Sequence, residues 1–206
     1  MLRILGRVTS INVRKVLWTA DELGLTYAHE DWGLPLRDPD VPEFRTLNPN
    51  AQVPVLIDGD FVLWESHAIM RYLAEREASH LLPADVRQRA IVEQWLGWQA
   101  SDLNMSWRYA VAARVRHLAG YDDEARIAES LKEWTSKMRV LDARLGETGA
   151  YVAGAEFSLA DLALGLSAHR WFGGAFERPD LTHVSAYYER VRARPAALAH
   201  FSAATP

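Results

Sequence analysis

The sequence predicts an α/β domain followed by an all-helical domain. Strand-like runs separated by turn residues are confined to the first 65 residues, and the rest of the chain has helical periodicity with almost no strand signal. With 206 residues, the chain can form one large domain or two small ones. We expect a first domain at residues 1–76, a linker at 77–86 and a helical domain at 87–206, because the helical pattern lapses around Pro83.

The composition excludes several classes of function. The net charge is −4 and 49% of the residues are hydrophobic, so nothing indicates a surface for nucleic acid or an anionic membrane. The chain contains no cysteine, which excludes disulfides, thiolate zinc sites and a cysteine nucleophile of its own. Any sulfur chemistry must therefore use the thiol of a ligand. No apolar run is long enough for a signal peptide or a membrane span, and we expect a cytoplasmic protein.

Three runs in the first domain predict the strands of a small sheet. The runs are LRIL at residues 2–5, LTYAHE at 25–30 and VPVLIDGDFVLW at 53–64. The last run contains two strands, because the Asp58-Gly59-Asp60 segment interrupts it as a hairpin turn would.

Two helices are expected between and after these strands. Apolar residues between positions 12 and 23 follow helical spacing, with Asn12 as the expected cap and Gly24 as the stop. A strand, a helix and a second strand in this order imply a right-handed parallel crossover. The second helix is expected over residues 66–74, with Ser66 as its cap.

The second domain is predicted to consist of helices. Residues 87–119 predict one long helix or a bent one, and an apolar stripe within residues 131–145 faces a bundle core. Ser158 lies three residues before Asp161, just ahead of the apolar run at 162–166. This spacing predicts a capping box, in which each residue bonds the backbone of the other at the start of a helix.

Three clusters in the first domain could bind a ligand, and the first begins at Thr9. It lies where the first strand ends and the first helix starts. The hydroxyl of Ser10 and the free amide N–H groups of the first helical turn would favour an anion at this place. The structural alternative is that Asn12 only caps the helix and Ser10 only forms the turn.

The second cluster spans residues 48–56, where Pro54 stands at the entrance of an apolar strand. Proline cannot donate to the hydrogen-bond ladder of a sheet, so it belongs at the start of a strand. A cis Val53–Pro54 bond would leave the backbone of Val53 free to pair with an extended, peptide-like ligand. The alternative is an ordinary trans proline at the end of a loop.

The third cluster is the pair Glu65 and Ser66, at the junction of the last strand with the second helix. Ser66 offers a hydroxyl and a helix N-terminus to a carboxylate, whereas Glu65 can hold an ammonium group. Together the two residues match the two charges of an α-amino acid. The alternative is a capped helix preceded by a surface glutamate.

Taken together and in this order, the clusters resemble those of the cytosolic glutathione S-transferases, most closely the bacterial members that use a serine. The resemblance extends over essentially the full chain. The matching stretches are Ser10-x-Asn12-Val13-Arg14-Lys15-Val16, Asn48-Pro49-Asn50-Ala51-Gln52-Val53-Pro54-Val55-Leu56, Trp64-Glu65-Ser66-His67-Ala68-Ile69 and Phe157-Ser158-Leu159-Ala160-Asp161. The resemblance implies a thioredoxin-like βαβαββα domain that binds glutathione, followed by a helical bundle domain that contributes the site for an electrophile.

The resemblance also implies roles at the sulfur of glutathione. Ser10 would donate its hydroxyl to the sulfur, with Asn12 as a second donor. Thr9 directly precedes Ser10, and a shift of one residue would exchange their roles. The spacing to Asn12 favours Ser10.

The rest of glutathione would be bound by the second and third clusters. Pro54 would be the cis proline of the family, and the backbone of Val53 would pair with the cysteinyl unit. Gln52 would approach the backbone of the ligand or its glycyl end. Glu65 and Ser66 would bind the amine and the carboxylate of the γ-glutamyl unit.

Other matches with the family concern stability and the second substrate. Ser158 and Asp161 match the family's folding element, so we assign them to stability. Trp107 and Arg108 lie where the family builds its electrophile site, and the alternative is that tryptophans here are core residues of a helical bundle. Where many relatives hold the glycyl carboxylate with a lysine or histidine, only Arg37 is basic here.

The predicted function is that of an enzyme, a glutathione S-transferase that uses reduced glutathione as co-substrate for attack on a small hydrophobic electrophile. The alternatives are a glutathione-dependent disulfide or peroxide reductase at the same site, and a non-catalytic protein-binding scaffold of the same fold. The resemblance implies a homodimer and a role in detoxification. The seven histidines show no metal-binding spacing, so we expect no metal, and no nucleic-acid or membrane partner.

Overall fold

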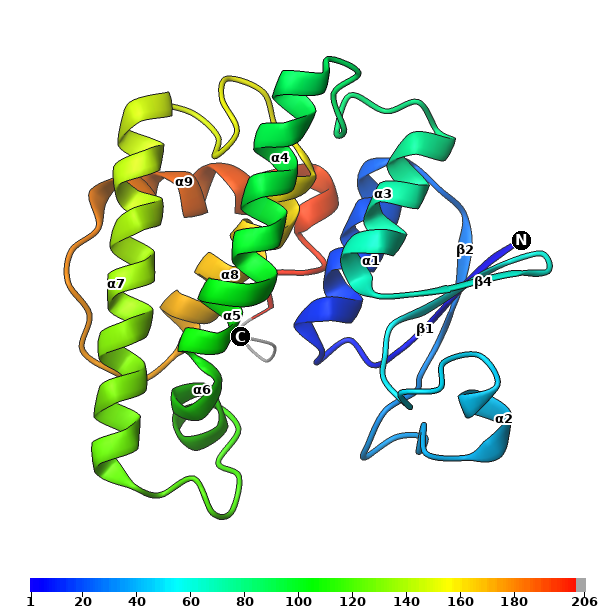
Figure 1. Ribbon diagram of the computed structural model, residues 1–206, viewed down its shortest axis with the longest axis horizontal. Helices are drawn as coiled ribbons and strands as arrows, with labels where there is room; N and C mark the ends of the chain where they lie inside the picture. Colours follow the sequence, from blue (N-terminus) through cyan, green and yellow to red (C-terminus); the bar gives the residue numbers. More distant parts are fainter. Residues whose placement is uncertain (203–206) are drawn as a thin grey trace. The chain divides into compact units, whose positions relative to one another are not determined.

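The computed structural model describes residues 1–202, which form two compact units (Figure 1). The first unit comprises Met1–Leu82 together with the segment that begins at Pro195, and the second comprises Pro83–Arg194. The last segment therefore groups with the first unit, whereas the sequence places residues 87–206 in one helical domain. The functional boundaries given above stay predictions.

The first unit contains a mixed four-stranded sheet with the strand order β2-β1-β3-β4. The strands are β1 (Leu2–Leu5), β2 (Tyr27–Glu30), β3 (Val55–Asp58) and β4 (Phe61–Trp64). β1 is parallel to β2 and antiparallel to β3, and β3 is antiparallel to β4. All four strands lie within the runs that the sequence predicts, and the connection from β1 to β2 is the expected helical crossover.

Three helices accompany the sheet, and two of them begin differently from the prediction. They are α1 (Ile11–Glu22), α2 (Pro42–Arg45) and α3 (Ser66–Arg76). The cap of α1 is Ser10 and not Asn12, because Ile11 is itself buried and already helical. Ser66 is the first helical residue of α3 and not its cap, because the chain enters the helix directly after Glu65, whose φ is 75°. The order of elements is βαβαββα, as predicted.

The two faces of the sheet have separate apolar cores. α1 and α3 lie side by side on one face, where their apolar residues pack on Leu2, Ile4 and Leu56 (Figure 1). On the other face, Trp32 and Phe44 pack against the opposite side chains of β1 and β3. α1 therefore has one side fixed to the sheet, and this fixes where its N-terminus lies.

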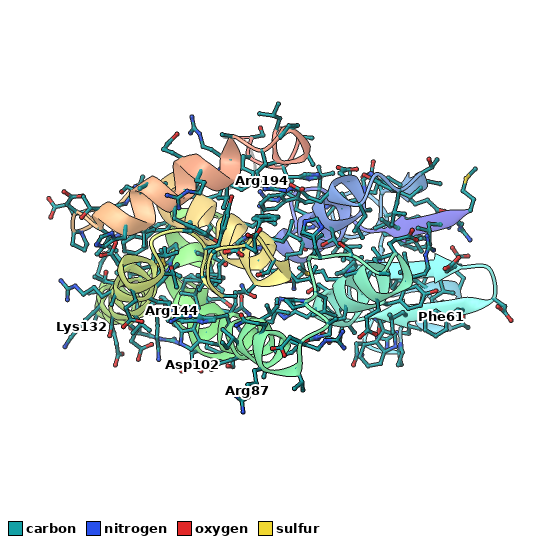
Figure 2. All side chains as sticks on the ribbon, turned by 90° about the horizontal axis from the view of Figure 1, so that it is seen from above. Phe61, Arg87, Asp102, Lys132, Arg144 and Arg194 are labelled. Atoms are coloured by element: carbon teal, nitrogen blue, oxygen red, sulfur yellow. The ribbon has the colours of Figure 1, made fainter. Side chains whose placement is uncertain are left out.

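The second unit consists of helices. They are α4 (Val86–Trp98), a π-helical turn (Gln99–Leu103), α5 (Asn104–Ser106), α6 (Arg108–Arg114), α7 (Glu124–Thr148), α8 (Leu159–Gly173) and α9 (Thr182–Arg192). The segment at 87–119 is thus the bent alternative, interrupted at the π-helical turn and again at Trp107. Charged residues such as Arg87 and Lys132 extend outward from α4 and α7 (Figure 2). In the part of the chain that the structure describes, no helix is long and apolar enough to cross a membrane.

Asp161 links three segments at the start of α8. Its carboxylate accepts hydrogen bonds from the backbone N–H groups of Val152 and Ser158, each at 2.9 Å, and from the hydroxyls of Ser158 and Tyr187. The predicted capping box is therefore present. Burial raises the pKa of Asp161 to about 6, so the carboxyl is mostly ionised at neutral pH.

We expect Asp161→Ala to lower the free energy of unfolding by about 3 kcal/mol or more, because two buried N–H groups lose their acceptor. Asp123→Ala is the matched control. Asp123 caps α7 from an exposed position, and its loss should cost about 1 kcal/mol. Urea denaturation followed by circular dichroism measures both, and equal losses in the two variants would refute the structural role of Asp161.

Candidate functional site

The strand register brings the three clusters to one edge of the sheet. Leu5, at the end of β1, pairs with Val55, at the start of β3, and Val55 pairs with Trp64, at the end of β4. Because neighbouring strands lie about 4.8 Å apart, the loops that continue from these residues begin within about 10 Å of one another. The sequence predicts the three clusters separately, and the register explains how they form one site.

Gly6 holds two of these loops in contact. It has a φ of +150°, and a Cβ added to it would lie 2.4 Å from Cγ2 of Val13 and 3.1 Å from Cβ of Val53. The backbone after β1 therefore packs directly against the first turns of α1 and against the loop before β3. This close approach is possible only without a side chain at this position.

Ser10 occupies the cap position of α1 with a hydroxyl that is available to a ligand. Its backbone is extended (φ −85°, ψ 122°), and its side chain makes no cap hydrogen bond. The side chain is half-buried, whereas Thr9 and Asn12 on either side are exposed. The first N–H groups of α1 have no acceptor within the helix, so an anion at this point meets both a hydroxyl and a helix N-terminus.

The Val53–Pro54 peptide bond is cis, as the family resemblance implies. Val53 makes no backbone-to-backbone hydrogen bond to another described residue. Gln52 is exposed, and its carbonyl accepts a hydrogen bond of 2.8 Å from Nδ2 of Asn48. The backbone of Val53 can therefore pair with a ligand that has the chemistry of a peptide.

Asn48 shapes this loop, a role that was not predicted for it from the sequence. It is 2% exposed, donates to the Gln52 carbonyl and accepts from the backbone N–H of Asn50 through Oδ1. These two bonds close the loop before Val53. The signal in the sequence is an asparagine directly before a proline, a pair typical of turns in which the side chain bonds its own backbone two residues on.

Glu65 and Ser66 directly follow the end of β4, the last of the three strand ends at this edge. Glu65 is exposed and has a φ of 75°, a left-handed conformation that costs a non-glycine residue energy. Ser66 is 6% exposed and lies at the first position of α3. The glutamate thus presents its carboxylate to solvent beside the N-terminus of a helix, which is the arrangement expected for a site that binds an ammonium and a carboxylate together.

Lys15 of α1 and His67 of α3 connect these two helices near the loops. Nζ of Lys15 lies 3.1 Å from Nε2 of His67, and Lys15 is 2% exposed. The histidine contacts a side chain of α1, so its place beside Glu65 and Ser66 is explained by packing between α1 and α3. Arg37 is also engaged, because its guanidinium lies 3.6 Å from the Trp32 ring centroid and pairs with Glu43.

Trp107 and Arg108, the residues predicted for the electrophile site, belong to the second unit. Trp107 is 2% exposed, and its ring packs edge-on against that of Trp134 at 5.5 Å. Its position is that of a core tryptophan, the alternative considered from the sequence. Arg108 is exposed and donates to Sδ of Met105.

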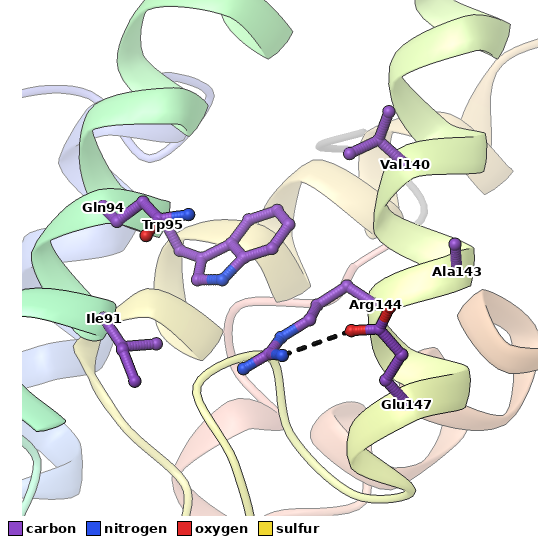
Figure 3. Close-up of a pocket in the computed structure, with 7 residues that line it drawn as sticks. All are labelled: Ile91, Gln94, Trp95, Val140, Ala143, Arg144 and Glu147. Carbon is purple, nitrogen blue, oxygen red and sulfur yellow. Dashed lines mark hydrogen bonds and ion pairs between the residues drawn. The ribbon is translucent and has the colours of Figure 1, made fainter.

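A pocket of about 510 Å³ lies between α4 and α7 in the second unit. Trp95 and Arg144 reach into it from the two helices, and Arg144 pairs with Glu147 (Figure 3). None of the residues predicted for ligand binding lines this pocket. Within residues 1–202, no group of three or more histidine, aspartate and glutamate side chains could hold a metal ion.

The fold is a thioredoxin-like sheet whose edge carries groups suited to a small peptide ligand with both charges of an amino acid. Comparison with known proteins identifies the family. The model of the glutathione S-transferase N-terminal domain matches residues 2–75, and that of the C-terminal domain matches residues 93–195. The chain belongs to the glutathione S-transferase family. The predictions of a transferase and of glutathione as its co-substrate are confirmed at the level of the family.

Individual relatives are similar over nearly their full length. Glutathione S-transferase GstB of Escherichia coli is 33% identical, covering 95% of both chains, and glutathione S-transferase 3 of Zea mays is 35% identical, covering 95% of this chain and 90% of the maize protein. Among solved structures, a theta class glutathione S-transferase of Xanthomonas axonopodis pv. citri with glutathione bound is 39% identical. Its TM-score is 0.92, with 97% of this chain and 96% of that chain covered.

We expect Gly6→Ala to weaken glutathione binding and to destabilise the fold by about 2 kcal/mol, because the added methyl group overlaps Val13 and approaches Val53. Gly24→Ala is the control. Gly24 also has a positive φ, +65°, but a Cβ there meets no atom within 4 Å. It should cost about 1 kcal/mol and leave glutathione affinity unchanged in isothermal titration calorimetry. Unchanged affinity in Gly6→Ala would contradict the packing argument.

Proposed function

We propose that the first unit binds glutathione along the sheet edge and that Ser10 activates its thiol, as in the serine-type bacterial members of the family. The observation that carries this proposal is the hydroxyl of Ser10. It makes no cap bond, lies at the N-terminus of α1 and shares a sheet edge with Val53 and Glu65. Asn12, exposed in the first turn of the same helix, is the second donor to the sulfur.

The strength of one hydrogen bond is sufficient for this activation. A free cysteine thiol ionises near pH 8.5, so only a few per cent is thiolate at neutral pH. A hydrogen bond to the charged form, worth about 1 to 3 kcal/mol, lowers the thiol pKa by roughly one to two units. At pH 7 the thiolate fraction of the bound thiol then rises to about one quarter for a shift of one unit and to about three quarters for a shift of two units.

The remaining groups orient the ligand. The backbone of Val53 pairs with the cysteinyl unit, Pro54 shapes this loop, and Gln52 approaches the glycyl end. Glu65 binds the γ-glutamyl amine, while Ser66 and the first N–H groups of α3 bind its carboxylate. This assignment uses each group according to its charge and hydrogen-bonding capacity.

The reaction is conjugation with a small hydrophobic electrophile. The thiolate sulfur attacks an electrophilic carbon, the C–S bond forms, and the leaving group departs with the electrons of the bond that breaks. Arg108 is the exposed candidate for contact with the electrophile, whereas the burial of Trp107 argues for a role in the core. A homodimer and a cytoplasmic location, both consistent with the family, complete the proposal.

We expect Ser10→Ala to raise the pKa of bound glutathione by one to two units and to lower kcat/KM at neutral pH by about 10- to 100-fold. Thr9→Ala is the matched control and should behave as the unmodified protein does. Ultraviolet difference absorbance of the thiolate during a glutathione titration, with S-methylglutathione as blank, gives the pKa. A normal thiolate signal in Ser10→Ala would refute the role of Ser10, and a loss in Thr9→Ala would reassign it.

We expect Glu65→Gln to weaken glutathione binding by tenfold or more, about 1.4 kcal/mol, because it loses the charge that binds the amine. A glutathione analogue without the γ-glutamyl amine serves as the control ligand. Its affinity should be the same for the variant and the unmodified protein. Equal weakening of both ligands would show that the substitution disturbs the loop and does not remove a specific contact.

A further inference from the structure

Arg14 is a buried cation one helical turn after Ser10. It is 1% exposed and lies on the same stripe of α1 as Ser10, since residues four apart face the same side of a helix and lie about 6 Å apart. Long side chains on a helix lean toward its N-terminus, which is the direction of Ser10. This tendency would place the positive charge of the guanidinium toward the end of α1 where Ser10 lies.

No carboxylate neutralises Arg14 within residues 1–202. Its Nη1 donates to the backbone carbonyl of His200 at 2.9 Å, while Nε and Nη2 are buried without a hydrogen-bond partner among the described residues. Burial lowers the pKa of Arg14 to about 10, which leaves it charged at neutral pH. A buried charge that lacks a counterion costs stability, so such an arrangement requires an explanation.

The C-terminal segment, of which residues 195–202 are described, covers this stripe of α1. The ring of His200 stacks on Trp18, with centroids 6.4 Å apart, and Phe201 meets Trp18 edge-on at 5.1 Å. Nε2 of His200 lies 2.7 Å from a carboxylate oxygen of Asp21, which lies seven residues after Arg14 on the same face. The segment thus excludes water from the guanidinium and supplies the carbonyl that holds it.

The other charged groups near Arg14 have partners. Asp21 bonds both His200 and the hydroxyl of Tyr27. Glu22 accepts a hydrogen bond from Trp18. From α3, His67 meets α1 through Lys15, which is itself buried.

We propose that Arg14 is a positioning residue for thiol activation: its buried charge, desolvated and held by the C-terminal segment, favours the thiolate of glutathione at Ser10. The proposal rests on the role of Ser10 given above. A charge in a poorly hydrated region acts on a neighbouring ionisation more strongly than one in water, and an opposite charge favours the ionised form. Arg14 acts through the field at Ser10 and needs no contact with glutathione.

The test compares Arg14→Gln, which removes the charge and keeps a donor for the His200 carbonyl, with Arg14→Lys, which keeps a charge. Thiolate absorbance against pH gives the pKa of bound glutathione, and calorimetry with S-methylglutathione gives the affinity of the binding site. We expect Arg14→Gln to raise the thiol pKa by about one unit, a roughly tenfold loss of thiolate below that pKa, and Arg14→Lys to restore most of it. Affinity for S-methylglutathione should change less than twofold.

Two results would overturn the proposal. One is an unchanged pKa in folded Arg14→Gln, and the other is an equal rise in Arg14→Gln and Arg14→Lys, which would indicate lost packing. If Arg14→Gln does not fold, His200→Ala keeps the carbonyl and hydrates the guanidinium, and it should raise the pKa in the same direction; no rise would refute the proposal. A failure of the Ser10 assignment can be told apart from a failure of the Arg14 proposal. In the first case Ser10→Ala would leave the thiolate signal intact.

Discussion

The pairing of β3 with the strands on either side is the constraint on which the whole proposed glutathione site depends. Val55 pairs with Leu5 on one side and with Trp64 on the other, so the three loops that carry the binding groups start from adjacent positions. A slip of β3 by one residue would turn its apolar side chains to the wrong faces of the sheet. It would also separate Val53 from Gly6. The apolar cores that fix the register therefore also fix the site.

α1 connects this site to the rest of the first unit through two different faces. One face is apolar and packs on the sheet, with Val13 and Val16 fully buried. The other face carries Arg14 and Trp18, and it is covered by residues from the end of the chain. The first face is explained by hydrophobic burial alone, whereas the second retains a charge at a cost in stability. Departures from the most stable arrangement are typical of functional sites.

The sequence predicts the elements well because apolar periodicity and turn residues are local signals. It misplaces the start of two helices by one or two residues, since the burial of Ile11 and the left-handed backbone of Glu65 depend on tertiary packing. Each cluster of the site lies at a strand end and has a local pattern. Their convergence requires the register, and the contact between Arg14 and His200 joins residues 186 positions apart. No local pattern in the sequence encodes such a contact.

The return of the C-terminal segment to α1 also bears on how the chain folds during synthesis. The sheet, α1 and α3 are all encoded within the first 82 residues, and they leave the ribosome long before the segment that begins at Pro195. Until then Trp18 lacks the rings of His200 and Phe201, and the guanidinium of Arg14 is hydrated. Trp18 and Arg14 therefore gain these contacts only after residues 195–202 have been synthesised.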